Sequence, residues 1–257
     1  MSHSKISKSV NWAGSTYLRP ESLDYAYSVV RPMRFYTEGI LLGSGSCFLV
    51  GLNGRAYAVT AKHVPINQMA RFEEARILMP GSDYSLPIIG HFCPRSTHLT
   101  DEHIDILVYL VDLDKFRSLG GGEVAFIDLD ECFFPAKHLI GKGAAVVGYP
   151  ALDDRYDYEN KKIYDTILVR TGSISESIYG EPIYMLSSTP SLNTFDGLSG
   201  SPVFGATNRT ALVGMVVRGT NSSGILHFID FTVVLSALLV HQADHPEDPA
   251  ASTILNA

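Results

Sequence analysis

Short apolar runs rich in Val, Ile, Tyr and Phe alternate with turn residues along most of the chain. The clearest example is residues 47–61, where two half-apolar stretches flank Asn53-Gly54. This dipeptide is the most typical signal of a two-residue β-hairpin turn. Asp196-Gly197 marks a similar turn ahead of the apolar pair Val203-Phe204. Short runs of this composition are typical of β-strands, so the pattern predicts an all-β fold.

One segment, residues 231–242, has the pattern of a helix instead. Its apolar residues recur at the spacing that places them on one helix face: Val234, Leu235, Leu238 and Leu239. Upstream, Gly120-Gly121-Gly122 is the best candidate for a linker within the β-rich part of the chain. The sequence therefore predicts two β-rich halves followed by a C-terminal α-helix.

The composition agrees with this picture and restricts the partners. The chain has 257 residues, of which 46% are hydrophobic and 10% aromatic, enough for a sizeable core. Its net charge of −7 argues against a nucleic-acid partner, because phosphate binding needs a basic face. No apolar run is long enough to span a membrane, and residues 1–8 lack the apolar stretch of a secretory signal. We therefore expect no membrane partner.

The number of cysteines indicates the cellular compartment of the protein. There are three, an odd number that does not make a disulfide framework. This favours a reducing, cytoplasmic location. Cys93 lies close in the sequence to His91, His98 and His103, and side chains of these types can bind zinc. These residues lack the paired spacing of zinc ligands, so we expect no metal.

The segment from Gly197 to Pro202, Gly-Leu-Ser-Gly-Ser-Pro, contains the strongest candidate for chemistry. Ser199 stands between glycines on a turn that leads into an apolar strand. Small neighbours let the backbone fold tightly, which exposes the hydroxyl and lets amide N–H groups face a substrate oxygen. Ser199 is therefore a candidate nucleophile.

A candidate base and a candidate acid precede this serine in the chain. His63 follows the second strand of the predicted hairpin, at the rim of a sheet. Asp105 stands at the head of the apolar strand 106–110, where a carboxylate needs a hydrogen-bond donor such as an imidazole N–H. Asp101 and Asp112 are rival acids, but neither precedes an aliphatic strand in this way.

With the order His63, Asp105, Ser199, the chain resembles the trypsin/chymotrypsin-like serine proteases, and among them it is most similar to the small bacterial members. The resemblance covers roughly residues 35–242 and extends to the segments 43–48, 146–150 and 212–217. It implies two six-stranded antiparallel β-barrels of chymotrypsin type with a C-terminal α-helix. The expected divisions are an extension at 1–34, barrels at 35–120 and 121–229, a helix at 230–243 and a mobile tail at 244–257.

The resemblance also implies an activity, a serine endopeptidase that needs no cofactor. Ser199 would attack the scissile carbonyl, His63 would take its proton, and Asp105 would orient His63. The backbone N–H groups of Gly197 and Ser199 would form the oxyanion hole. Its substrate is a protein or peptide, and we expect narrow specificity, controlled by the substrate or by a regulatory protein partner.

Positions counted from Ser199 in the family pattern indicate the substrate-binding residues. Asn193 would form the base of the primary pocket, which argues against a preference for Lys or Arg and, with a glycine-lined wall, suits a medium-sized polar or apolar side chain. Val217, Arg218 and Gly219 would form the strand that pairs with substrate. Arg218 and His227 could instead favour an acidic residue, although Val216 stands where glutamyl endopeptidases have a histidine.

The chain also departs from the family. Leu198 stands where digestive relatives have an aspartate that pairs with a freshly cleaved N-terminus, so we expect no activation by N-terminal cleavage. Two other functions stay open. One is a catalytically silent module of the same fold that binds peptides through an exposed strand. The other is an esterase or acyl transferase that uses the same three residues.

Overall fold

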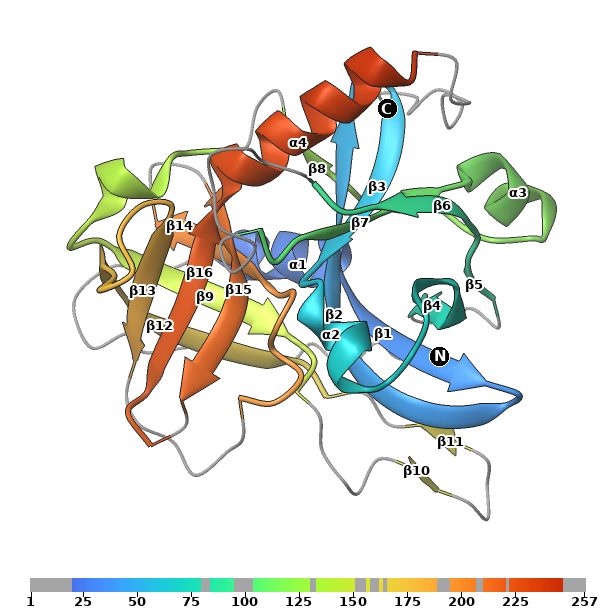
Figure 1. Ribbon diagram of the computed structural model, residues 1–257, viewed down its shortest axis with the longest axis horizontal. Coiled ribbons are helices and arrows are strands. Elements are labelled where there is room, and N and C mark those ends of the chain that lie inside the picture. Colours follow the sequence, from blue (N-terminus) through green and yellow to red (C-terminus); the bar gives the residue numbers. More distant parts are fainter. Residues whose placement is uncertain are drawn as a thin grey trace.

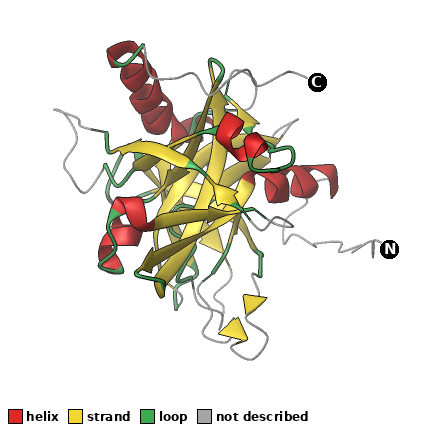
Figure 2. Ribbon diagram, turned by 90° about the vertical axis from the view of Figure 1, so that its right-hand side faces the viewer, coloured by secondary structure: helices red, strands yellow, loops and turns green. Residues whose placement is uncertain are grey.

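The computed structural model describes residues 20–79, 84–94, 104–129, 133–150, 156–157, 162–163, 166–188, 195–206, 210–220 and 222–246. Two β-rich bodies lie side by side (Figure 1), the first half of the chain in one and the second half in the other. Figure 2 shows the strands gathered at the centre of the molecule and the helices around them. Asn53 and Gly54 both have positive φ, and Leu52 pairs with Arg55, so the predicted hairpin is confirmed.

The N-terminal sheet follows the order β5-β4-β1-β2-β3-β7-β6. Its two ends are joined, because β5 and β6 are separated only by Pro87, which has no N–H to donate. The bent segment that they form pairs with β4 at one end and β7 at the other, which closes the sheet into a barrel. The strands are β1 Val30–Thr37, β2 Ile40–Leu52, β3 Arg55–Thr60, β4 Ala75–Leu78, β5 Ser85–Leu86, β6 Ile88–Phe92 and β7 Leu107–Val111.

The C-terminal sheet is a closed antiparallel barrel in the order β12-β13-β16-β15-β14-β9. A separate pair of short strands, β10 Tyr156–Asp157 and β11 Lys162–Ile163, lies outside it. The predicted fold class, two antiparallel barrels followed by a helix, is confirmed. The barrel strands are β9 Gly143–Gly148, β12 Leu168–Glu176, β13 Ile183–Ser188, β14 Pro202–Ala206, β15 Thr210–Thr220 and β16 Ile225–Asp230.

The helices are short except the last one. Asp230 caps this helix by accepting the backbone N–H and the hydroxyl of Thr232, and it also accepts the N–H of Ala136. The α-helices are α1 Pro20–Val29, α2 His63–Asn67, α3 Leu113–Ser118 and α4 Phe231–Asp244, and the 3₁₀ turns are η1 Phe72–Glu74 and η3 Ala136–Leu139.

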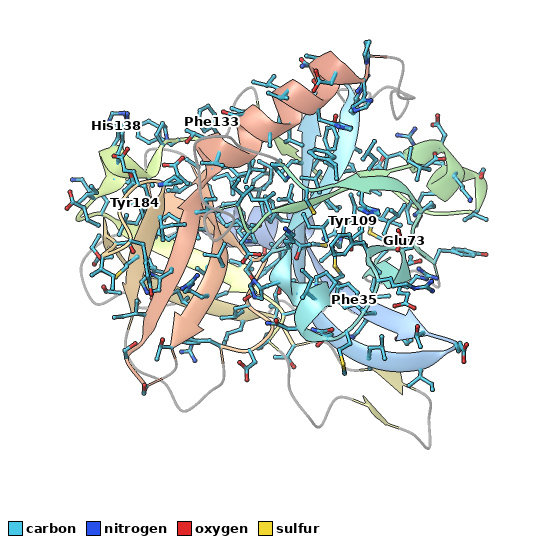
Figure 3. All side chains as sticks on the ribbon, viewed as in Figure 1. Phe35, Glu73, Tyr109, Phe133, His138 and Tyr184 are labelled. Atoms are coloured by element: carbon cyan, nitrogen blue, oxygen red, sulfur yellow. The ribbon has the colours of Figure 1, made fainter. Side chains whose placement is uncertain are left out.

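Two hydrophobic clusters fill the interior. The larger one lies in the N-terminal barrel, where Phe35 and Tyr109 are fully buried, and continues into the contact with the other barrel (Figure 3). The smaller one, which includes Tyr184, fills the C-terminal barrel. Phe231 of α4 packs against Phe48 of β2, with ring centroids 6.1 Å apart. Apolar side chains therefore join the two barrels as well as filling them.

Two features of the structure differ from the expected divisions. β1 begins at Val30, ahead of the expected start of the first barrel at residue 35, because its residues pair with β2 from Val30 onward. β8 Ile127–Asp128 follows the glycine run but pairs in parallel with β2, so this segment stays with the N-terminal sheet. In the N-terminal extension, Tyr25 packs against the core.

The far end of α4 is held to the N-terminal barrel by Gln242. Its Nε2 donates to the carbonyl of Leu52 at 3.0 Å and to the hydroxyl of Tyr57 at 2.9 Å. Its Oε1 accepts from the Nδ2 of Asn53 at 2.9 Å. Figure 1 shows the helix running from the C-terminal barrel across to the β2–β3 hairpin. The side chain therefore ties the last element of one half to the hairpin of the other.

Replacing Gln242 by Ala is expected to lower the free energy of unfolding by about 1–3 kcal/mol, because each hydrogen bond contributes about 1 kcal/mol net. Urea unfolding measures this. Ser236→Ala on the same helix is the control, since among the described residues its hydroxyl bonds to Thr232 within the helix and to no residue of the N-terminal barrel. Equal stabilities for the two variants would contradict the role assigned to Gln242.

Candidate active site

His63 and Asp105 both come from the N-terminal barrel. His63 is the first residue of α2, just after β3 ends at Thr60, and Asp105 precedes β7, which pairs with β3. The Asp105 carboxylate accepts the backbone N–H of His63 through Oδ1 at 2.9 Å and contacts the ring Nδ1 through Oδ2 at 2.5 Å. Two donors from one residue therefore hold the carboxylate, which fixes the plane of the imidazole.

Ser199 comes from the other barrel, in the turn before β14. Its Oγ lies 2.9 Å from Nε2 of His63. Because a carboxylate accepts hydrogen bonds, the proton on the ring belongs on Nδ1, and Nε2 is left to accept the serine hydroxyl. The structure thus brings together all three residues predicted as nucleophile, base and acid. The two barrels meet at this chain of hydrogen bonds.

The turn that presents Ser199 has a defined backbone conformation. Leu198 N–H donates to the carbonyl of Phe195 at 3.0 Å, and Gly197 between them has φ +83°. A positive φ at the third residue is the signature of a type II turn, which suits glycine. Among the described residues, neither the N–H of Gly197 nor that of Ser199 donates to a protein acceptor. Both amides are therefore available for a substrate oxygen.

Leu198, between these two donors, is fully buried in the core of the C-terminal barrel. A leucine here anchors the turn by apolar packing. An aspartate in the same place would need a cationic partner inside the core.

A cleft of about 670 Å³ opens beside Ser199 and His63. Val217, Arg218 and Gly219 form one wall, so the structure brings the predicted substrate-binding strand next to the triad. Asn193, the predicted base of the primary pocket, lies outside the described residues. The cleft also contains residues that were not predicted as site residues, among them Ser44, Lys62, Gln68 and Phe195. These residues come from β2, from the ends of α2 and from the turn before Ser199, and only the folded chain brings them together.

Arg218 belongs to a small cluster at this wall. Its guanidinium carbon lies 5.1 Å from the centre of the Tyr179 ring, a cation–π contact, and Tyr179 in turn lies edge-on to His227 at 5.2 Å. The ring Nδ1 of His227 is 3.3 Å from the hydroxyl of Ser177. Burial lowers the pKa of His227, and the positive charge of Arg218 lowers it further.

The other candidate acids and zinc ligands either contact neighbouring elements or lie outside the described residues. Asp112 caps α3 by accepting the N–H of Lys115, and Asp101 lies outside the described residues. His91 packs between the rings of Phe72 and Tyr109. Within the described ranges, no group of three or more His, Cys, Asp and Glu side chains is arranged to hold a metal ion; His98 and His103 lie outside those ranges.

Solved structures of serine proteases align with this fold. A thermostable serine protease, AL20, from an extremophilic microorganism aligns with a TM-score of 0.56 and 14% identity, over 85% of this chain and 99% of its own. The serine endoprotease of Yersinia pestis aligns with a TM-score of 0.57 and 16% identity, over 87% of this chain and 66% of its own. This chain has the fold of serine proteases.

A third protease, Anisep from Arthrobacter nicotinovorans, aligns with a TM-score of 0.52 and 15% identity, over 84% of this chain and 96% of its own. By sequence, no protein-family model matches the chain and no curated protein matches it. The resemblance seen in the motifs is therefore confirmed through the fold. Separately, no helix in the described part of the chain is long and apolar enough to cross a membrane.

The cluster at the cleft wall makes a test of local electrostatics possible. Replacing Arg218 by Gln is expected to raise the pKa of His227, because it removes one of the two causes that lower it. Burial remains, so the pKa stays below the usual value of about 6.5. NMR titration of the imidazole protons measures the change. Lys115→Gln, on the exposed surface of α3, should leave this pKa where it is, and an equal shift in both variants would contradict the assignment.

Proposed function

We propose that the protein is a serine endopeptidase that hydrolyses peptide bonds through an acyl-enzyme intermediate. The observation that supports this most directly is the chain of hydrogen bonds from Asp105 through His63 to Ser199 at the edge of an open cleft. The alignment of the fold with serine proteases agrees with it.

In this proposal the hydroxyl of Ser199 attacks the scissile carbonyl carbon while its proton passes to Nε2 of His63. The tetrahedral intermediate collapses, the C–N bond breaks, and the amine leaves with the proton returned by His63. Water then attacks the acyl-enzyme and loses a proton to His63, and as the ester bond breaks His63 returns this proton to Oγ of Ser199, which releases the acid and restores the starting state. Atoms and charge balance without any cofactor.

Asp105 and two backbone amides support these steps. Asp105 holds Nδ1 protonated, so that Nε2 faces the hydroxyl, and it stabilises the imidazolium that forms. The negative charge that develops on the carbonyl oxygen is taken up by the N–H groups of Gly197 and Ser199. Preorganised donors of this kind act only on charge that appears in the transition state, so they raise the rate rather than the affinity.

We propose that the exposed end of β15, Val217 to Gly219, binds the substrate backbone. Arg218 makes no ion pair within the described residues, and its stacking on Tyr179 holds the cation at the cleft wall. An acidic substrate side chain near the scissile bond would provide the missing partner. This gives a physical basis for a narrow specificity.

We also propose where the enzyme acts and how its activity is controlled. Free thiols at Cys47 and Cys93 agree with action in a reducing, bacterial cytoplasm. Because buried Leu198 replaces the aspartate of the digestive relatives, we propose control by substrate selectivity or a regulatory protein partner rather than by N-terminal cleavage. A catalytically silent peptide-binding module is the less favoured alternative, since such a module has no use for the His63–Ser199 hydrogen bond or the available amides.

Replacing Ser199 or His63 by Ala is expected to reduce the turnover of a cleaved peptide by about 10⁶-fold, and Asp105→Asn by about 10⁴-fold. The loss arises because the nucleophile, its base and the orienting acid act as one unit. Cleavage of a peptide library by the wild type identifies the peptide, and mass spectrometry after fluorophosphonate treatment locates the adduct.

An adduct on Ser199 together with peptide cleavage supports the proposal. An adduct with ester hydrolysis but no peptide cleavage would favour an esterase or acyl transferase instead. A folded wild type without adduct or cleavage would overturn the enzyme assignment and favour the peptide-binding module. Asp112→Asn serves as a control for Asp105→Asn, because in the described part of the chain that carboxylate caps α3 and does not contact His63.

Replacing Arg218 by Glu is expected to reverse the charge preference of the cleft. The wild type should cleave a peptide with an acidic residue near the scissile bond about fivefold faster than its Lys counterpart, as about 1 kcal/mol for an exposed charge pair implies. The variant should prefer the Lys peptide by a similar factor. Lys115→Glu changes the net charge equally but lies outside the cleft, and a reversal there too would show that Arg218 is not the cause.

A further inference from the structure

Ser46 of β2 is fully buried, yet its hydroxyl bonds to the opposite barrel. Its Oγ donates to the carbonyl of Gly197 at 2.7 Å and accepts the N–H of Tyr149 at 2.8 Å. The carbonyl of Tyr149 is farther away, at 3.4 Å, so the single hydroxyl proton belongs to the bond with Gly197. One side chain of the N-terminal barrel therefore joins two backbone segments of the C-terminal barrel.

The carbonyl that Ser46 holds belongs to the peptide between Gly197 and Leu198. The other end of that peptide is also held, since the N–H of Leu198 donates to the carbonyl of Phe195 at 3.0 Å. This peptide lies between the two proposed oxyanion donors, the amides of Gly197 and Ser199. A rotation of the peptide would turn both flanking amides, so the two hydrogen bonds together fix the direction of the donors.

Ser46 is itself held firmly. Thr60 Oγ1 at the end of β3 donates to the carbonyl of Ser46 at 2.8 Å. Gly200 packs directly against this pair, because a Cβ there would lie 2.2 Å from the Ser46 carbonyl oxygen and 2.3 Å from Thr60 Oγ1. Only a glycine, here with φ +84°, allows this approach. The turn with Ser199 is thus seated against the strands that lead to His63.

We propose that Ser46 is a positioning residue that sets the oxyanion hole through the Gly197–Leu198 peptide. The inference rests on the proposed function for its catalytic meaning. Whatever the function, the hydroxyl of Ser46 makes the direction of the Gly197 and Ser199 amides in one barrel depend on the docking of the other barrel. The chain thereby gains an uncharged, cross-barrel support for the turn, beside the apolar anchor provided by Leu198.

The test is Ser46→Ala. The kcat for a cleaved library peptide is expected to fall about 10- to 100-fold with KM nearly unchanged, less than the 10²–10³-fold loss of an oxyanion donor itself. The rate constant of fluorophosphonate inactivation should fall by a similar factor. Amide hydrogen exchange should accelerate at Leu198 and Tyr149, whose N–H groups depend on this arrangement.

Ser201→Ala is the matched control. Ser201 is also fully buried and lies next to Gly200, but its hydroxyl has no hydrogen-bond partner among the described residues. We expect this variant to keep the wild-type kcat, inactivation rate and exchange. Thermal unfolding of both variants shows whether activity is lost while the protein is still folded.

Two results would overturn the inference. One is a Ser46→Ala protein with wild-type kcat and wild-type exchange at Leu198 and Tyr149. The other is a loss of kcat that only follows the unfolded fraction or that Ser201→Ala shares. A wild type that neither cleaves nor reacts would defeat the proposed function instead, and the exchange comparison would still decide whether Ser46 holds the turn.

Discussion

The close contact between the β2–β3 strands and the turn that presents Ser199 is the constraint on which the candidate site depends. Gly200 approaches the carbonyl of Ser46 and the hydroxyl of Thr60 at distances that leave no room for a Cβ. His63 and Asp105 belong to one barrel and Ser199 to the other, so the 2.9 Å contact between His63 and Ser199 exists only when the barrels are docked this closely. The candidate site therefore forms only when the two barrels dock.

The docking has both apolar and polar support. The larger hydrophobic cluster contains buried residues from both barrels, including Phe48 and Tyr149, so separating the halves would expose apolar surface to water. At the other end of the contact, α4 leaves the C-terminal barrel and bonds to the β2–β3 hairpin through Gln242. The hairpin is therefore held near its turn by the helix and near its base by the contact with Gly200.

The turn with Ser199 is held mostly by uncharged groups in this chain. Leu198 lies in the core, Gly197 has the positive φ that its turn requires, and the hydroxyl of Ser46 holds the peptide between them. Burying a charged residue at Leu198 would carry a large desolvation cost that only a well-placed partner offsets. An apolar anchor and a neutral hydrogen bond avoid that cost, and they need no chemical event to form.

The sequence by itself determined the strand-rich fold, the Asn53-Gly54 hairpin, the C-terminal helix, and the three residues that meet at the cleft. The first three features are local, because turn dipeptides and apolar periodicity act over a few positions. The three residues follow from the glycines beside Ser199 and from the order His63, Asp105, Ser199, which resembles that of the serine proteases. Only the tertiary structure decided that β1 begins at Val30 and that β8 returns to the first sheet. It also decided that Ser46 bonds to the turn with Ser199 and that Tyr179 stacks on Arg218. Strand pairing and barrel docking join residues far apart in the chain, and no local pattern records such partners.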